Sequence, residues 1–510
     1  MSRTALPPEW QDLLEELQQR RAFAEGMGGE KRLAARAASG QPNIRQLIDQ
    51  LVDPGSFTEL GALVGGIGRH GAAPLPADAL VGGLARVNDR PVVVAGEDFT
   101  VKGGSIGHGT NAKRLRLARL AGQEQVPYIL LLDGAGARMT NSLERHPYAP
   151  TDLTAMAELV GRVPTVALVF GTSAGHGALS GVLADWVVMT EQACLFSAGP
   201  PLVAAALGEQ VSKEELGGAA LHAEVSGVCH NMAPDAATAC AMVRRYLSHL
   251  PSRAGEPPPR SRGEDTGPRS LDDLLRILPR NAQQPYDVRE VIQRIVDGGE
   301  FLEIQPRYGR SMVIGLARLG GHSLAVVANQ PMVQAGAITA EAADKASHFI
   351  DLANAYGLPV LFLADNPGIM SGRQAERAGT LRAAARMYLA QARLASPKLH
   401  VTLRKAYGFG SSIMAMNPFD GQTLTLALPG IALGGLPVRG GDVAAGLDSE
   451  ASATLAEAET EAAWVTADAM AYDDIIDPRQ LRNRLLAALA LAADRLAQPR
   501  PPVQVPPLRP

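Results

Sequence analysis

The chain has 510 residues and a formal net charge of −4 at pH 7; 46% of its residues are hydrophobic, 20% are charged and 4% are aromatic. This length exceeds what one ordinary hydrophobic core accommodates and predicts two domains. The weak negative charge and the scarcity of aromatic side chains argue against nucleic acid as a partner, because such binding calls for a basic surface and stacking platforms.

The cysteines and the amino-terminal segment exclude several other classes. Cys194, Cys229 and Cys240 form no CxxC pair, so we expect neither a disulfide framework nor a metal site. The first thirty residues are too charged to be a secretory signal. The most apolar stretch, 163–189, is interrupted by polar residues and glycines. We therefore expect a soluble, cytoplasmic protein with no membrane partner.

The sequence carries an internal duplication at a constant separation. Residues 83–87 read GLARV and residues 315–319 read GLARL, a separation of 315 − 83 = 232. The same separation links Lys113 and Lys345, Pro127 and Pro359, Asp133 and Asp365, and Gly136 and Gly368. A slip of one residue then aligns GHG at 175–177 with GFG at 408–410. The pattern predicts two copies of one fold.

In chain order, each copy is predicted to contain a strand, a helix and two further buried strands. In the first copy these elements are 91–95, 111–123, 128–132 and 166–170, and in the second they are 323–327, 343–356, 360–363 and 399–403. Short apolar runs that alternate with helices predict an α/β protein, with a largely parallel sheet covered on both faces in each half.

A segment rich in proline, glycine and charge separates the two copies. Residues 251–269 read PSRAGEPPPRSRGEDTGPR and have no apolar period, which is typical of a linker. We therefore predict a first domain at 1–269, with a helical extension at its amino terminus, and a second domain at 270–510.

Each copy places a glycine cluster directly after a buried strand. The clusters are GTSAGHG at 171–177 and YGFGSS at 407–412. A strand-to-helix turn of this kind lets backbone N–H groups converge at a helix start, where they can stabilise a developing oxyanion. One such glycine would more often mark only a tight turn. The repetition of the cluster in both copies favours a pair of oxyanion sites.

Several further motifs give the chain a resemblance to a known family. They are GGEKR at 28–32, DPGSF at 53–57, FTVKGGS at 99–105, GPPLV at 199–203, PYDVR at 285–289, NQPMV at 329–333, RKAYG at 404–408 and IIDP at 475–478. In this order they resemble the carboxyltransferase subunits of biotin-dependent acyl-CoA carboxylases, of the propionyl-, acetyl- and methylcrotonyl-CoA type. The resemblance implies two tandem crotonase-like (ClpP/crotonase) domains, the first binding acyl-CoA and the second binding biotin.

The resemblance also implies roles for particular residues. The turn at Gly175, His176 and Gly177 would hold the thioester enolate. The biotin ureido oxygen would lie at the second turn, formed by Gly408, Phe409 and Gly410. The implied substrate-binding residues are Gly103, Gly104, Ala135, Gly136, Ala137 and Ser412, and the implied biotin-binding residues are Gly336, Gly368 and Tyr407.

Biotin is expected to arrive on another polypeptide, because the chain has no MKM biotinylation motif and no ATP-binding glycine loop. The implied partners are a biotin carboxylase and a biotin carboxyl carrier subunit, and the implied assembly is a homo-oligomer, probably a hexamer by analogy. The substrate would be a coenzyme A thioester. The resemblance does not single out one acyl group, because different motifs match different branches of the family.

Three features depart from the family pattern. His176 and Phe409 stand where relatives usually have glycine or alanine, and the turn at 133–138 (DGAGAR) lacks the usual serine. We interpret His176 as a side chain packed behind its turn; the alternative is that its imidazole donates to an oxyanion or carries a proton. Arg114 belongs to a basic run at 113–119 that we interpret as a solvated helix face, with CoA phosphates as the alternative partner.

Two other functions remain open at this point. One is a decarboxylase of the same fold, which would move a carboxyl group from a malonyl- or glutaconyl-type thioester to biotin. The other is a scaffold that keeps the fold without activity.

Overall fold

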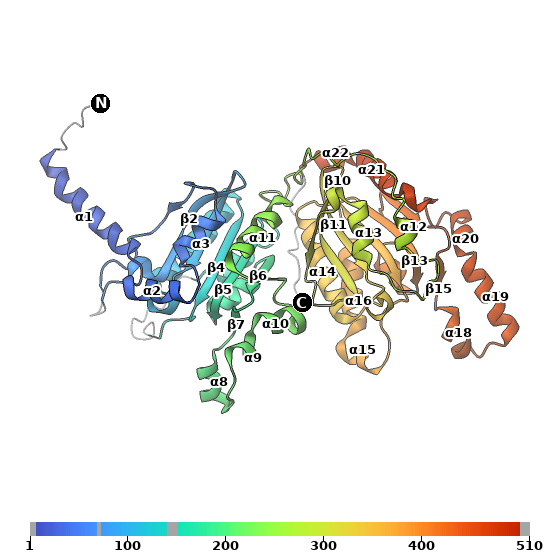
Figure 1. Ribbon diagram of the computed structural model, residues 1–510, viewed down its shortest axis with the longest axis horizontal. Coiled ribbons are helices and arrows are strands. Elements are labelled where there is room, and N and C mark those ends of the chain that lie inside the picture. The colour runs from blue at the N-terminus through green and yellow to red at the C-terminus, as the bar shows by residue number, and fades with distance from the viewer. Residues whose placement is uncertain (1–6, 69–72, 140–150, 500–510) are drawn as a thin grey trace. The chain divides into compact units, whose positions relative to one another are not determined.

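The computed structural model describes residues 7–68, 73–139 and 151–499. Within it the chain forms two compact units, Met1–Arg245 and Tyr246–Pro510 (Figure 1). The proline-rich segment 251–269 contains no helix and packs on the second unit; for example, the N–H of Ser261 donates to the carbonyl of Gly321 at 2.8 Å. The contacts therefore divide the chain ahead of this segment.

The first unit is built on a single mixed sheet. Its strand order is β1-β2-β3-β4-β5-β6-β8, with β7 paired to β5; β1, β2 and β3 pair antiparallel and the remaining pairs are parallel. The strands are β1 (Thr58–Glu59), β2 (Leu80–Val87), β3 (Arg90–Glu97), β4 (Tyr128–Gly134), β5 (Thr165–Ala174), β6 (Trp186–Thr190), β7 (Cys194–Phe196) and β8 (Asn231–Ala233).

Helices cover this sheet on both faces, and its core is formed by their apolar sides and the central strands. Every residue of β4 is buried, as its continuous apolar run predicts. In Figure 1, α3 lies over β2 and β3, and α8 and α9 follow β7 at the lower end of the sheet. The helices are α1 (Pro8–Glu25), α2 (Glu30–Ala38), α3 (Ile44–Leu51), α4 (His108–Glu124), α6 (Leu153–Leu159), α7 (His176–Val182), α8 (Pro200–Leu207), α9 (Lys213–Gly217), α10 (Ala219–Leu221) and α11 (Ala236–Ser248).

The second unit repeats this plan. Its sheet has the order β16-β14-β13-β12-β11-β10-β9, with β15 paired to β13. Its strands are β9 (Phe301–Ile304), β10 (Met312–Leu319), β11 (His322–Asn329), β12 (Val360–Asn366), β13 (Lys398–Tyr407), β14 (Leu424–Ala427), β15 (Ala432–Gly434) and β16 (Asp474–Ile475).

The helices of the second unit occupy matching places and add a carboxyl-terminal group. In Figure 1, α18, α19 and α20 lie beside β15. The helices are α12 (Leu274–Ile277), α13 (Val288–Ile295), α14 (Ala340–Ala355), α15 (Arg373–Ala378), α16 (Thr380–Ala392), α17 (Phe409–Ile413), α18 (Val438–Ala445), α19 (Ser449–Thr460), α20 (Ala462–Asp468), α21 (Leu481–Leu491) and α22 (Ala493–Ala497).

The predicted duplication is confirmed by the strand register. Val93 pairs with Tyr128, and Ala325 pairs with Val360, so both partners are shifted by 232 residues. The bulge between β4 and β5 at Leu132/Gly134 recurs between β12 and β13 at Ala364/Asn366, again 232 residues later. Because a slip of one residue would turn every side chain to the opposite face, the shared register means that equivalent residues face equivalent sides of the two sheets. The α/β class and the two predicted repeats are thus both present.

Candidate active site

In the first unit, the turn after β5 holds two backbone donors at the start of α7. Gly175 is the residue before the helix and has φ 58° and ψ −119°, a conformation that side-chain-bearing residues avoid. His176 and Gly177 are the first helical residues, so their N–H groups have no acceptor within the helix. Neither group donates to any other residue that the structure describes. Two unpaired N–H groups therefore meet at the end of a strand, as the glycine pattern predicted.

A third donor comes from the loop that follows β4. Ala137 forms an isolated parallel bridge with Ile106, in which the N–H of Ile106 donates to the carbonyl of Gly136 (2.8 Å) and the N–H of Arg138 donates to the carbonyl of Ile106 (2.9 Å). Because successive peptide groups alternate in direction, the N–H of Ala137 points away from Ile106. Gly136 packs tightly on the end of β5, since a Cβ there would lie 2.8 Å from the carbonyl oxygen of Ala174.

The second unit contains the same arrangement. Gly408 follows β13, precedes α17 and has φ 52° and ψ −139°, so Gly175 and Gly408 are equivalent, as the duplication predicted. The N–H groups of Phe409 and Gly410 have no acceptor in the part of the chain that the structure describes. Ile369 bridges Ile338 as Ala137 bridges Ile106. Ile369 was missed by the sequence analysis, although adding 232 to 137 identifies it.

Glu97 lies beneath the first turn and links the donors to β4. Glu97 Oε2 accepts a hydrogen bond from the backbone N–H of Asp133 at 2.9 Å, and a Cβ on Gly177 would lie 2.7 Å from Glu97 Oε1. Burial raises the pKa of Glu97 to about 7, and the nearby Arg114 only partly opposes this effect. A carboxyl group that titrates near neutral pH therefore lies directly below the oxyanion donors.

His176 is held from behind by a buried carboxylate. Its Nε2 contacts Asp152 Oδ1, while Arg114 Nε donates to Asp152 Oδ2 at 2.9 Å and Arg114 Nη1 donates to Glu97 Oε1 at 3.1 Å. Burial acts to raise the pKa of Asp152, but the charges and hydrogen bonds of Arg114 and His176 outweigh it and lower that pKa to about 2. The His176 side chain keeps 19% of its surface exposed, so it is anchored beside the turn and not enclosed behind it.

The basic run on α4 is not the solvated face that the sequence suggested. Arg114 is fully buried in the ion pairs just described, and Lys113 donates to the carbonyls of Ala77 (3.1 Å) and Leu80. Burial lowers the pKa of Lys113 to about 8. Both side chains hold the fold together and neither is available to CoA phosphates. The amphipathic interpretation failed because their polar ends meet carbonyls and carboxylates inside the unit.

A cavity of about 700 Å³ opens beside the first turn. Its lining includes Arg32, Phe99, Lys102 and Gly103. The carbonyl of Gly103 accepts from the N–H of Ala135 at 2.9 Å, which ties this cavity to the loop that carries Gly136 and Ala137. Gly104 packs against the end of β4. Five of the six predicted substrate-binding residues are thus gathered at one edge of the sheet.

Two cations in this cavity differ in their pairing. Arg36 forms an ion pair with Asp133 at 2.7 Å, whereas Lys102 is exposed and has no ion-pair partner among residues 7–68, 73–139 and 151–499. A free ammonium group at the mouth of a cavity can bind an anion such as a phosphate.

The second unit has a matching cavity of about 630 Å³. Ala335 and Pro367 line it and are neighbours of the predicted residues Gly336 and Gly368. Tyr407 also lines it and donates its hydroxyl to Glu459 of α19. The predicted biotin-binding residues are therefore brought together at the equivalent edge of the second sheet.

Ser412 is separated from both of these groups. It lies exposed on α17, two residues after the donor Gly410, in the second unit. The first unit holds the other five residues to which the sequence analysis gave the same role.

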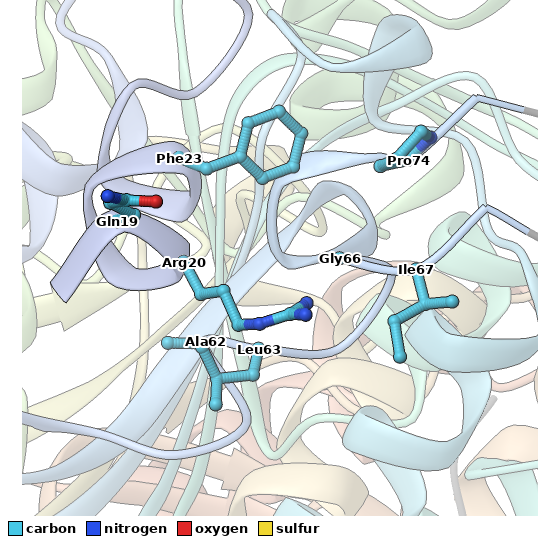
Figure 2. Close-up of a pocket in the computed structure, with 8 residues that line it drawn as sticks. All are labelled: Gln19, Arg20, Phe23, Ala62, Leu63, Gly66, Ile67 and Pro74. Carbon is cyan, nitrogen blue, oxygen red and sulfur yellow. The ribbon is translucent and has the colours of Figure 1, made fainter. Parts of the chain in front are cut away.

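A further cavity of about 460 Å³ lies between α1 and the loop after β1. Figure 2 shows Phe23 and Arg20 from α1 facing Leu63 and Ile67 across it. No predicted site residue lines this cavity. Within the described ranges, no cluster of three or more His, Cys, Asp or Glu side chains could hold a metal, and no helix is both long and apolar enough to cross a bilayer.

Comparison with known proteins agrees with this geometry. Residues 35–503 match the family model of the carboxyl transferase domain. The chain is 32% identical to the carboxyltransferase subunit of propionyl-CoA carboxylase from Haloferax mediterranei, over 96% of this chain and 98% of that one. It is equally 32% identical to the alpha subunit of methylmalonyl-CoA decarboxylase from Veillonella parvula, over 95% and 96% of the two chains.

The solved structure of transcarboxylase 12S, described as a hexamer with methylmalonyl-coenzyme A bound, superposes with a TM-score of 0.90. It shares 32% identity and covers 99% of this chain and 100% of that chain. The duplicated sheets, the paired donor turns and these similarities lead to one conclusion: the chain belongs to the carboxyl transferase domain family and is a crotonase-like carboxyltransferase subunit of the biotin-dependent acyl-CoA carboxylase type.

Proposed function

We propose that the first unit holds an acyl-CoA thioester and the second unit holds carboxybiotin, and that the carboxyl group passes to the α-carbon, or the vinylogous γ-carbon, of the acyl group. One observation carries this proposal. Each unit presents three unpaired backbone N–H groups at the end of its fourth and fifth strands: Ala137, His176 and Gly177 in the first unit and Ile369, Phe409 and Gly410 in the second.

Carboxyl transfer to a thioester needs two such sites. Removing the α-proton moves negative charge to the thioester oxygen, and releasing the carboxyl group moves charge to the ureido oxygen of biotin. Biotin supplies the carboxyl group and the basic nitrogen that removes the α-proton. The chain itself supplies fixed donors for both oxygens, and one donor of this kind is worth about 3 kcal/mol in other enzymes.

The two cavities support this assignment of the ligands. The cavity of the first unit carries Lys102 and Arg32 at its wall, which suits the phosphates of coenzyme A. The uncharged ureido ring of biotin would enter the cavity of the second unit, beside Tyr407 and Pro367. Its oxygen would then meet the donors of Phe409 and Gly410.

The biotin must come from partner proteins. Because the chain has no biotinylation motif and no ATP-binding loop, a biotin carboxyl carrier subunit and a biotin carboxylase are the proposed partners. The hexamer reported for transcarboxylase 12S supports a homohexamer for this chain as well.

Decarboxylation is the second candidate, and the similarity to the Veillonella decarboxylase subunit favours it. The two directions share one set of donors, so geometry alone does not separate them. An assay does: carboxylated biotin carrier is mixed with a panel of acyl-CoAs, and the reverse assay mixes free biotin carrier with malonyl-type thioesters.

We expect the forward reaction to yield a carboxylated acyl-CoA. Transfer seen only in the reverse assay would favour the decarboxylase, and transfer in neither assay, with CoA esters still bound, would favour a scaffold.

A further inference from the structure

The two units differ in the charge that surrounds their otherwise equivalent donor turns. In the first unit Glu97, Arg114, Asp152 and His176 form a continuous chain of ion pairs. Adding 232 to 97 and to 114 gives Asn329 and Ala346, which carry no charge.

At the turn itself, His176 corresponds to Phe409, whose side chain is 74% exposed. The second turn thus keeps the same backbone geometry without any of these ionisable groups. The fold does not need the charged chain, so the charged chain serves the chemistry of the first unit.

The contact with Asp152 decides which ring nitrogen of His176 is available. Asp152 is ionised at neutral pH, because its pKa is lowered to about 2, and a carboxylate only accepts hydrogen bonds. Nε2 of His176 must therefore carry the proton. In the neutral imidazole, Nδ1 then has a free lone pair, and Nδ1 has no partner among the residues that the structure describes.

The free nitrogen belongs to the same residue as one of the oxyanion donors. A thioester oxygen held by the N–H groups of His176 and Gly177 places its α-carbon two bonds away from that oxygen. The imidazole is fixed at the same turn by Asp152, itself held by Arg114. The substrate α-carbon and a basic nitrogen with a defined tautomer are therefore brought to one place.

We propose that His176 is a further catalytic residue, which exchanges a proton with the α-carbon of a bound acyl-CoA through Nδ1 without any help from biotin. Asp152 is its positioning residue. This inference rests on the proposed function, because it places the thioester at the first turn. It adds an activity that backbone donors alone do not provide.

The step is balanced within the site. The lone pair of Nδ1 takes the α-proton, the C–H bonding pair becomes the C=C bond of the enolate, and the carbonyl π pair moves to the thioester oxygen. The N–H groups of His176 and Gly177 hold that oxygen. The reverse step returns a proton, or a deuteron in heavy water, from Nδ1 to the carbon. No oxidant, reductant or second substrate is consumed.

The test uses the full-length protein and propionyl-CoA in D2O, without biotin or carrier protein, and follows deuterium at the α-carbon by mass spectrometry. We expect the wild type to exchange well above the buffer rate. His176→Phe, which copies the residue at the equivalent turn, should slow exchange by about a hundredfold or more. Exchange no faster than buffer in the wild type, or undiminished in His176→Phe, overturns the proposal.

Chemical rescue separates a proton carrier from a structural contact. His176→Gly should lose exchange and regain part of it when free imidazole is added, because the small residue leaves space beside Asp152. A lost structural contact would not respond in this way. Imidazole that stimulates the glycine variant no more than it stimulates the wild type would contradict the proposal.

Two controls keep the outcomes distinct. Thermal unfolding and propionyl-CoA binding by calorimetry show whether each variant is folded and binds substrate. The carboxyl-transfer assay with carboxylated carrier is run in parallel, and there we expect a much smaller loss than in exchange, because biotin supplies the base in that reaction. Exchange without carboxyl transfer sinks the proposed function alone; transfer without exchange sinks only this inference.

Discussion

Glu97 and Asn329 perform the same structural task at equivalent places in the two units. Glu97 Oε2 accepts from the backbone N–H of Asp133 at 2.9 Å, and Asn329 Oδ1 accepts from the N–H of Asp365 at 3.1 Å. The acceptor is required by the strand geometry, whereas the charge is present in the first unit alone. This pair leads directly to a prediction about pH.

Glu97→Gln should remove a pH dependence of stability. Burial raises the pKa of Glu97 from 4.5 to about 7 in the folded protein, so the folded state holds a proton that the unfolded state loses between these values. The wild type therefore loses stability as the pH rises from 4.5 to 7, by about 3 kcal/mol at most. The midpoint of thermal unfolding of Glu97→Gln should gain on the wild type over this range. A constant difference between the two proteins would contradict the assignment.

Proline at the first position of α7 should test the backbone donor itself. His176→Pro removes the N–H, and proline is well accepted at a helix start. His176→Gly also loses the imidazole but keeps the N–H, so the comparison isolates the donor. We expect kcat for carboxyl transfer to be about a hundredfold lower in the proline variant than in the glycine variant.

The same pair of changes in the second unit, Phe409→Pro and Phe409→Gly, provides a matched measurement for the other turn. Equal rates within each pair, with the fold intact by circular dichroism, would show that these N–H groups hold no oxyanion.

Lys102→Ala should weaken binding of the CoA ester without slowing chemistry. Lys102 lies exposed at the cavity of the first unit and has no ion-pair partner in the described part of the chain. A lost contact to a phosphate costs about 1.5 kcal/mol, so KM should rise about tenfold while kcat changes little.

A thioester of dephospho-CoA, which lacks one phosphate, indicates which phosphate is involved, because the variant and the wild type should treat it alike if Lys102 binds that group. A lower kcat with an unchanged KM would place Lys102 elsewhere in the mechanism.

Lys345→Met should destabilise the second unit strongly. Lys345 Nζ donates to the carbonyls of Gln305 (2.9 Å) and Tyr308 (2.6 Å), and burial lowers the pKa of this lysine to about 7. Methionine preserves the volume but leaves the carbonyls unsatisfied, at a cost of about 2–4 kcal/mol. Guanidinium unfolding measures it. Lys213→Met, at an exposed lysine, is the control and should change stability by about 0.5 kcal/mol or less.

The sequence by itself determined the duplication and the places of the donor turns. A constant separation of 232 residues, two apolar strands and a glycine cluster are local features, and each is read without knowledge of the fold. Gly175 and Gly408 could be named because only glycine suits the positive φ that joins each strand to its helix.

The tertiary structure alone decided the chemistry around those turns. Glu97, Arg114, Asp152 and His176 come from four separate places in the sequence, and no spacing links them. They meet because β3, α4, α6 and α7 pack against one another at the end of the sheet. The basic run on α4 was misinterpreted for the same reason: whether a charged side chain faces water or a buried carboxylate depends on what packs against it, and a single helix does not carry that information.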